Sequence, residues 1–223
     1  MKRIFDFFRN QPPGRLITLG FFLVIMTGAF LLLTPMARRP GVDVSFVDAL
    51  FTSTSAVCVT GLIAIDTYDT FSVFGRAVVA LLIQVGGLGV TSVGAGLILA
   101  AGKKFSFKGR LLIKEGLHVD SFKGVVSLVK SVLLMTFCFE LVGVILSFIV
   151  FVQDYPPLHA LGNSIFHSIA AFNNSGFDVL GGLQNLIPYR DDVLLNLTTC
   201  GLIIFGGIGF LVILDVLRNR FRF

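Results

Sequence analysis

The sequence contains Asp48-Ala-Leu-Phe-Thr-Ser-Thr-Ser-Ala-Val-Cys-Val-Thr-Gly-Leu62, and 115 positions further on it contains Asn163-Ser-Ile-Phe-His-Ser-Ile-Ala-Ala-Phe-Asn-Asn-Ser-Gly-Phe177. The two stretches share identical residues at four positions, and a fifth position keeps a hydroxyl group. The pairs are Phe51 and Phe166, Ser53 and Ser168, Ala56 and Ala171, Gly61 and Gly176, and the hydroxyl pair Thr60 and Ser175. Because self-similarity at a fixed spacing is the mark of repeated structure, we predict a duplicated unit.

A glycine motif follows each of these stretches. Gly86-Gly87-Leu88-Gly89 matches Gly206-Gly207-Ile208-Gly209 at a spacing of 120 positions. Small residues in apolar helices usually allow two helices to pack closely, and this is the interpretation that we favour. An ion path along the glycines is the alternative.

The composition is that of a membrane protein, with 55% apolar and 14% charged residues. Soluble domains have about 45–50% and about 25%. Since a membrane-spanning helix needs about 20 mostly apolar residues, four spans are predicted. They cover residues 16–37, 77–102, 131–153 and 193–214. Two shorter apolar stretches, residues 44–62 and 158–177, each lie between two spans, and we interpret each as a re-entrant helix followed by an extended turn.

The basic residues predict the orientation. Of the 18 Lys and Arg residues, 14 lie before the first span, between the second and third spans, or after the fourth. Because cytoplasmic segments carry the excess of Lys and Arg, both termini are predicted to be cytoplasmic, and both re-entrant stretches enter from outside. The net charge of +5 is therefore a topological bias, and no nucleic-acid partner is expected.

The turns after the two short helices have the features of a cation pore. Non-helical backbone at membrane depth must be buried in protein or line a wet cavity. The C-terminal end of a short helix carries partial negative charge, and successive carbonyls can replace the water around an ion. Gly61 and Gly176 allow the positive φ that turns carbonyls inward. The sequence therefore predicts two cation pore loops.

These features resemble the Trk/Ktr family of potassium uptake proteins. The resemblance rests on the turns 56–62 and 172–177, the run 48–55, and the glycine motif in the following span. The short N-terminus looks more like the Ktr branch. The resemblance implies an all-α integral membrane protein with two tandem span–pore-loop–span repeats, which are half of a four-repeat potassium-channel-like fold. It also implies potassium uptake across the plasma membrane.

The resemblance also implies which backbone carbonyls bind potassium. In the first turn they are those of Val57, Cys58, Val59 and Thr60, ending at Gly61, and in the second those of Asn173, Asn174 and Ser175, ending at Gly176. We call residues 57–61 and 173–176 the first and second candidate filter segments. Each would be one quarter of a selectivity filter.

Because that family has four repeats in one chain, we expect this chain to be a fragment or half of such a protein. Its predicted parts are a cytoplasmic N-terminus (1–14), a first repeat (15–102), a basic cytoplasmic loop (103–124), a second repeat (125–217) and a truncated cytoplasmic tail (218–223). The expected partners are the remaining two repeats, a homodimer of complete subunits, a cytosolic ring of nucleotide-binding regulator and the lipid bilayer. The expected location is the bacterial plasma membrane. Potassium is the transported ligand, no resident metal or cofactor is expected, and sodium coupling stays open.

Alternatives to transport are a non-conducting membrane scaffold and a small membrane enzyme. The sequence places no catalytic set of His, Ser, Cys and acidic residues, which argues against an enzyme. Glu140 is the only charge inside a predicted span. It is predicted to make a structural hydrogen bond or ion pair, with a functional role as the alternative. His167, Cys138 and Cys200 are predicted to be packing residues in the core.

Overall fold

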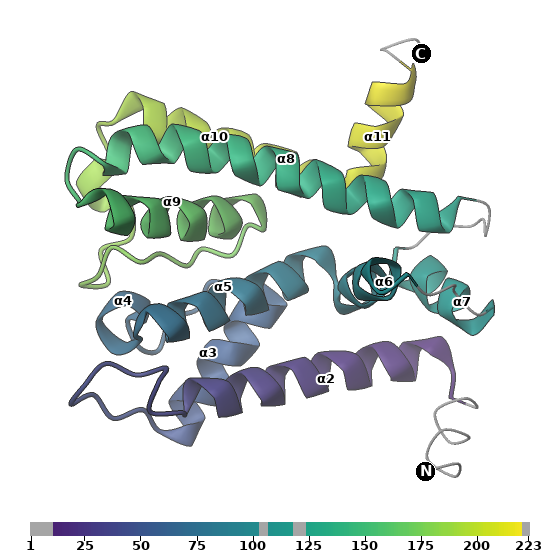
Figure 1. Ribbon diagram of the computed structural model, residues 1–223, viewed down its shortest axis with the longest axis horizontal. Coiled ribbons are helices and arrows are strands. Elements are labelled where there is room, and N and C mark those ends of the chain that lie inside the picture. Colours follow the sequence, from purple (N-terminus) through teal and green to yellow (C-terminus); the bar gives the residue numbers. More distant parts are fainter. Residues whose placement is uncertain (1–10, 103–106, 118–123, 220–223) are drawn as a thin grey trace.

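The computed structural model describes residues 11–102, 107–117 and 124–219, and the regular elements in these ranges are helices (Figure 1). The first half contains α2 (Pro13–Leu32), α3 (Phe46–Cys58), α4 (Thr67–Thr70), α5 (Val73–Leu88), α6 (Val90–Ala100) and α7 (Phe107–Gly116). The second half contains α8 (Val125–Phe151), α9 (Pro157–Phe172), the short 3₁₀ helix η1 (Ile187–Tyr189), α10 (Val193–Ile208) and α11 (Phe210–Asn219). The described part of the protein is therefore all-α, as predicted.

The helices form two groups that meet along α5 and α9. Helices α2, α3 and α5 pack together, and so do α8, α9 and α10. Figure 1 shows the first group in its lower half and the second group in its upper half. One buried apolar cluster contains Val57 and Val79 from the first group and Phe166 from the second. The core therefore joins the two groups.

Serine hydroxyls hold each short helix against the long helix before it. The Ser53 Oγ on α3 donates to the carbonyl oxygen of Ile25 on α2 at 2.7 Å. The Ser168 Oγ on α9 donates to the carbonyl oxygen of Glu140 on α8, also at 2.7 Å. A Cβ at Gly28 or at Gly143 would collide with the corresponding serine hydroxyl. Both helix pairs therefore approach closely over a glycine, 115 positions apart.

The second and fourth predicted spans are each two helices rather than one. Helices α5 and α6 meet at an angle of 102°, and α10 and α11 meet at 95°. The break in the first pair lies at Gly89, with φ 79° and ψ 134°, and in the second at Gly209, with φ 92° and ψ 142°. A helix cannot continue through positive φ, and glycine alone adopts it without strain. Hydropathy alone does not detect such a break.

Length and composition agree with a membrane protein. Helices α2 and α8 are long and apolar enough to cross a membrane, and the described residues contain up to four spans if each bent pair counts as one. A helix that was not predicted, α7, occupies part of the basic loop 103–124. The predicted N-terminus 1–14, the remainder of that loop, and the predicted tail 218–223 lie largely outside the described residues.

The prediction that Cys138 and Cys200 are core residues is wrong. Both side chains are exposed on the surface, on α8 and α10 respectively. Many large apolar side chains of the same helices are exposed as well, including Leu134 and Leu197. Because the outer surface of a membrane helix is as apolar as its core, apolar character does not indicate burial in such a chain.

Candidate functional site

The first candidate filter segment overlaps the end of α3, because Val57 and Cys58 are the last two residues of that helix. Val59 follows the helix in the left-handed conformation, with φ 55°, and the Thr60 amide donates to the Ser55 carbonyl at 3.0 Å. The Ser55 hydroxyl donates to the Leu62 carbonyl at 2.7 Å and lies 2.9 Å from the Thr60 hydroxyl. The serine therefore ties the end of the segment back to its helix. Gly61 then reverses the backbone with φ 71°.

The second segment follows α9 with the same backbone course. Asn174 has φ 58°, and the Ser175 amide donates to the Ala170 carbonyl at 2.9 Å. Gly176 has φ 71°, the value found at Gly61. One difference matters: Ala170 stands where the first unit has Ser55, and alanine has no hydroxyl to bind the turn. The second segment needs another anchor.

The two glycine turns lie against each other. A Cβ at Gly61 would lie 2.9 Å from the Ser175 carbonyl oxygen and 3.5 Å from the Gly176 Cα. A Cβ at Gly176 would lie 3.2 Å from the Gly61 Cα. The fold thus brings together two candidate segments that lie 115 positions apart in the sequence.

The glycine motifs pack directly on the segments. A Cβ at Gly86 would collide with the Val57 carbonyl oxygen, and one at Gly206 would collide with the Phe172 carbonyl oxygen. These contacts agree with the close-packing interpretation of the first glycine of each motif. The last glycine has another role, because Gly89 and Gly209 have no atom near the Cβ position and instead break the helix.

Glu140 is hydrogen-bonded to two side chains, and the sequence does not predict either partner. The Asn173 Nδ2 donates to the Glu140 Oε1 at 3.4 Å and to the Gln84 Oε1 at 3.1 Å. The Glu140 carboxylate is also hydrogen-bonded to the Gln84 side chain. Asn173 thus contributes a side-chain contact as well as a backbone carbonyl. Nothing in the spacing of these three residues indicates the cluster.

His167 packs inside the second group, as predicted. Its Nε2 lies 3.0 Å from the Thr199 Oγ1 on α10, and its ring meets the Phe151 ring edge-to-face. The ring is buried and lies between three helices. This environment is that of a packing residue with one hydrogen-bond partner.

Two aspartates at α4 join the first group to the loop that follows α9 in the second group. The Asp69 carboxylate accepts from the Gly182 amide at 2.9 Å, and the Asp66 carboxylate accepts from the Leu183 amide at 2.8 Å. In the same loop, burial raises the pKa of Asp178, and the nearby Asp66 charge raises it further.

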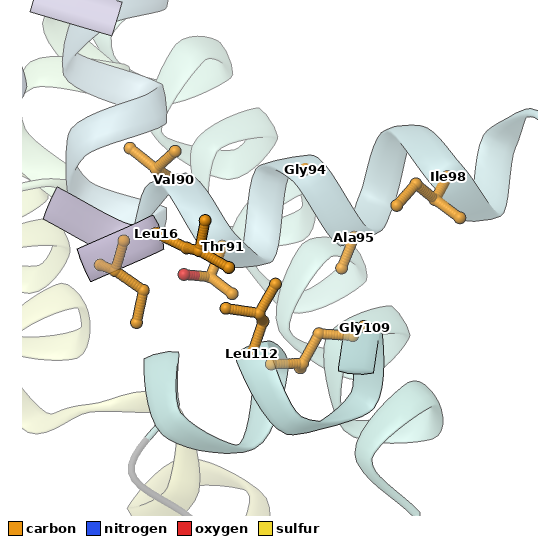
Figure 2. Close-up of a pocket in the computed structure, with 10 residues that line it drawn as sticks. Leu16, Val90, Thr91, Gly94, Ala95, Ile98, Gly109 and Leu112 are labelled. Atoms are coloured by element: carbon orange, nitrogen blue, oxygen red, sulfur yellow. The ribbon is translucent and has the colours of Figure 1, made fainter. Parts of the chain in front are cut away.

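Two cavities lie at the ends of the bent helices. One of about 440 Å³ is lined by both glycine motifs, including Gly87 and Gly209, together with Leu117 and Val132. A smaller one, about 190 Å³, lies between α2, α6 and α7, where Figure 2 shows Leu16, Thr91 and Leu112 grouped around it. The lining of the smaller cavity is almost entirely apolar, so it does not suit an ion.

The structure shows no cluster of three or more His, Cys, Asp or Glu side chains suited to a metal ion, within residues 11–102, 107–117 and 124–219. At the meeting point of the two turns, the Ser175 carbonyl oxygen is the atom nearest to the Cβ position of Gly61. Carbonyl oxygens suit alkali cations, because they can replace the water molecules that surround such an ion in solution.

Comparison with known proteins shows which family this chain is similar to. A family model described as TrkH, cation transport protein, matches residues 19–221. The chain is 40% identical to the Ktr system potassium uptake protein B of Bacillus subtilis over 218 residues, which is 98% of this chain and 48% of that protein. It is 39% identical to protein D of the same system in that organism, over 92% of this chain and 45% of the relative.

A third relative is the potassium/sodium uptake protein NtpJ of Enterococcus hirae, which is 37% identical over 94% of this chain and 46% of its own length. The chain therefore spans about half the length of these relatives. Three relatives named as uptake proteins and a match over most of the chain confirm the resemblance seen in the sequence. The chain belongs to the TrkH family of cation transport proteins.

Proposed function

We propose that this chain takes part in potassium uptake across the bacterial plasma membrane, supplying two of the four segments of a selectivity filter. The ligands are the backbone carbonyls of residues 57–61 and 173–176, which replace the water around a dehydrated ion. The observation that carries the proposal is the contact between Gly61 and Gly176, which holds two turns of the same backbone conformation side by side.

The proposed duplication is supported by matched contacts. The hydroxyl bonds of Ser53 and Ser168 recur at a spacing of 115 positions, and so do the left-handed residues Val59 and Asn174. After the turns the spacing becomes 120, because the second outer loop is longer by five residues. The helix-capping side chains Ser72 and Asp192 and the glycine breaks follow this second spacing.

We further propose that both termini are cytoplasmic. The beginning of α2, the helix α7 and the end of α11 lie toward one end of the molecule, and α4 lies toward the other (Figure 1). The basic segments of the sequence adjoin the end that holds the beginning of α2, the helix α7 and the end of α11. Because cytoplasmic segments carry the excess of Lys and Arg, this end is proposed to face the cytoplasm. The larger cavity is lined in part by Gly86 and Gly87, which also pack against Val57 and Asn173 of the candidate filter segments.

Closing a filter requires two more segments, which a second chain or a further part of the protein would supply. Complete subunits would pair as a homodimer on a cytosolic ring of nucleotide-binding regulator, as the sequence resemblance implies. Potassium is the proposed cargo. Sodium coupling is a second proposal, and the name of the Enterococcus hirae relative includes both ions.

The proposal is tested by growth of a potassium-uptake-deficient bacterial strain at low potassium. The chain is expressed alone, and also together with the part of the Bacillus subtilis relative that it does not match. Rescue in either case supports transport. A chain that reaches the membrane but rescues growth in neither case would refute the transport proposal and favour a non-conducting scaffold.

The filter assignment is tested separately with Gly61→Asp. An acidic side chain at a positive-φ glycine packed on the other turn would displace both segments, so any rescue should be abolished. Gly162→Ala on α9 is the matched control, because no atom lies within 4 Å of its Cβ position. Continued rescue by Gly61→Asp would show that residues 57–61 are not the ion site.

A further inference from the structure

We propose that Glu140 and Gln84 are positioning residues that hold the second candidate filter segment in place through the side chain of Asn173. We call these three side chains the Asn173 clamp. The inference rests on the proposed function, because it concerns the same segment. It assigns a role to the only charged residue of a predicted span and links the two helix groups at the depth of the filter.

In the clamp, the side-chain nitrogen of Asn173 lies within hydrogen-bonding distance of three acceptors. The Asn173 Nδ2 lies 3.1 Å from the Gln84 Oε1, 3.4 Å from the Glu140 Oε1 and 2.9 Å from the Ile169 carbonyl oxygen. The acceptors come from α5, α8 and α9 respectively. Since one donor group contacts three helices, its position is fixed relative to all of them.

Burial of Asn173 increases the cost of losing any of its hydrogen bonds. Asn173 is 8% exposed, and Glu140 lies on α8, which is long and apolar enough to cross a membrane. A buried amide that loses its acceptor cannot turn to water, so the cost is greater than at a surface. Gly87 provides the room: a Cβ there would collide with the Asn173 Oδ1.

The first candidate filter segment is held in a different way. There the Ser55 hydroxyl binds the Leu62 carbonyl and contacts the Thr60 hydroxyl. The second unit has Ala170 at the position of Ser55 and therefore lacks this internal tie. Conversely, the first unit has no clamp, since Cys58, Ile25 and Ile204 stand at the positions that correspond to Asn173, Glu140 and Gln84. The two segments are thus held by chemically distinct side-chain bonds, from a serine hydroxyl in the first and from an asparagine amide in the second.

The clamp acts on the proposed ligands directly. The Asn173 side chain and the Asn173 carbonyl belong to one residue, so a bond that fixes the side chain also limits how far the backbone at this proposed ligand can shift. Discrimination between potassium and the smaller sodium ion depends on the number and direction of such carbonyls. Loosening the clamp should therefore change ion preference before it prevents folding.

The first test is local hydrogen exchange in the purified chain. Loss of one buried hydrogen bond should speed exchange of the amides of residues 172–177 by about five- to tenfold in Glu140→Ala and by less in Gln84→Ala. Glu140→Gln keeps an acceptor oxygen at the same position and should exchange like the unaltered chain. Leu141→Ala, an exposed neighbour on α8, is the matched control and should leave the segment unchanged. Ser55→Ala should speed exchange at residues 57–61 only.

The second test is ion preference in the growth and uptake assay described above. Glu140→Ala should lower the potassium-to-sodium uptake ratio, and Glu140→Gln should restore it. An unchanged segment in Glu140→Ala, or a Glu140→Gln variant as defective as Glu140→Ala, would overturn the clamp. If the unaltered chain transports nothing, the proposed function fails, and the exchange experiment still decides whether the clamp exists.

Discussion

Gly61 and Gly176 face each other at the contact between the two candidate filter segments, each with φ 71°. A methyl group on Gly61 would press against the Ser175 carbonyl, and one on Gly176 would press against the Gly61 Cα. Glycine is therefore required at both positions for two reasons: the backbone has positive φ, and the contact leaves no room for a side chain.

The first prediction concerns this pair. Gly61→Ala and Gly176→Ala should each destabilise the chain by about 1–2 kcal/mol from the left-handed backbone alone, with a further cost for the contact. The measurement is the thermal unfolding midpoint in detergent. As a control, Gly201→Ala on α10 places a methyl group where no atom lies within 4 Å and should raise or preserve the midpoint. Equal midpoints for Gly61→Ala and Gly201→Ala would contradict the packing described here.

The second prediction separates two neighbouring glycines. Gly206→Ala should destabilise the protein, because its methyl group would meet the Phe172 carbonyl oxygen. Gly207→Ala should be tolerated, since the nearest atom to its Cβ position is the Asn174 Nδ2 at 3.7 Å. Overpacking of this kind costs about 1–3 kcal/mol. The comparison is made by thermal unfolding of the two variants, and a Gly207→Ala variant that is the less stable of the two would refute the assigned packing.

The third prediction concerns the break between α5 and α6. In Gly89→Ala a methyl group meets no neighbour, so the whole effect comes from the backbone at φ 79°. The variant should favour a continuous helix. Spin labels at the exposed positions Leu81 and Leu97, in a chain whose cysteines are replaced, should then report a longer distance than in the unaltered protein. An unchanged distance would show that packing, not Gly89, makes the bend.

The fourth prediction concerns pH. Burial first, and then the Asp66 charge, raise the pKa of Asp178 above its ordinary value, against the hydrogen bond from the Leu180 amide at 2.9 Å, which lowers it. The folded state therefore binds this proton more tightly than the unfolded state does. The resulting stabilisation is full below the unfolded pKa of about 3.9 and is lost as the pH rises through the folded pKa.

Asp178→Asn should remove that dependence while keeping an oxygen that accepts from Leu180. Its unfolding midpoint at neutral pH should match or exceed that of the unaltered chain, and the difference should shrink as the pH falls toward 4 or so. Asp43→Asn, at a side chain fully exposed to solvent, is the control. Its unfolding midpoint should stay close to that of the unaltered chain at both pH values. A variant that loses stability at neutral pH would contradict the direction of the Asp178 shift.

The sequence alone determined the architecture and the family. Runs of apolar residues exceed what a soluble core requires, and their positions, with the turns at Gly61 and Gly176, predicted an all-α membrane protein related to potassium uptake proteins. These features are local: a span, a turn and a positive-φ glycine each depend on a few consecutive residues. The glycine motifs were also understood in part, because close packing was expected of small residues.

The tertiary structure decided what depends on residues far apart in the chain. The two predicted spans are bent at Gly89 and Gly209, although the glycine motif in the sequence is also compatible with a straight helix. The tertiary structure exposed Cys138, because an apolar residue in a membrane helix is equally stable facing lipid or core. It also gave Glu140 its partners, Asn173 and Gln84, since hydrogen bonds between separate helices leave no periodic trace in a sequence.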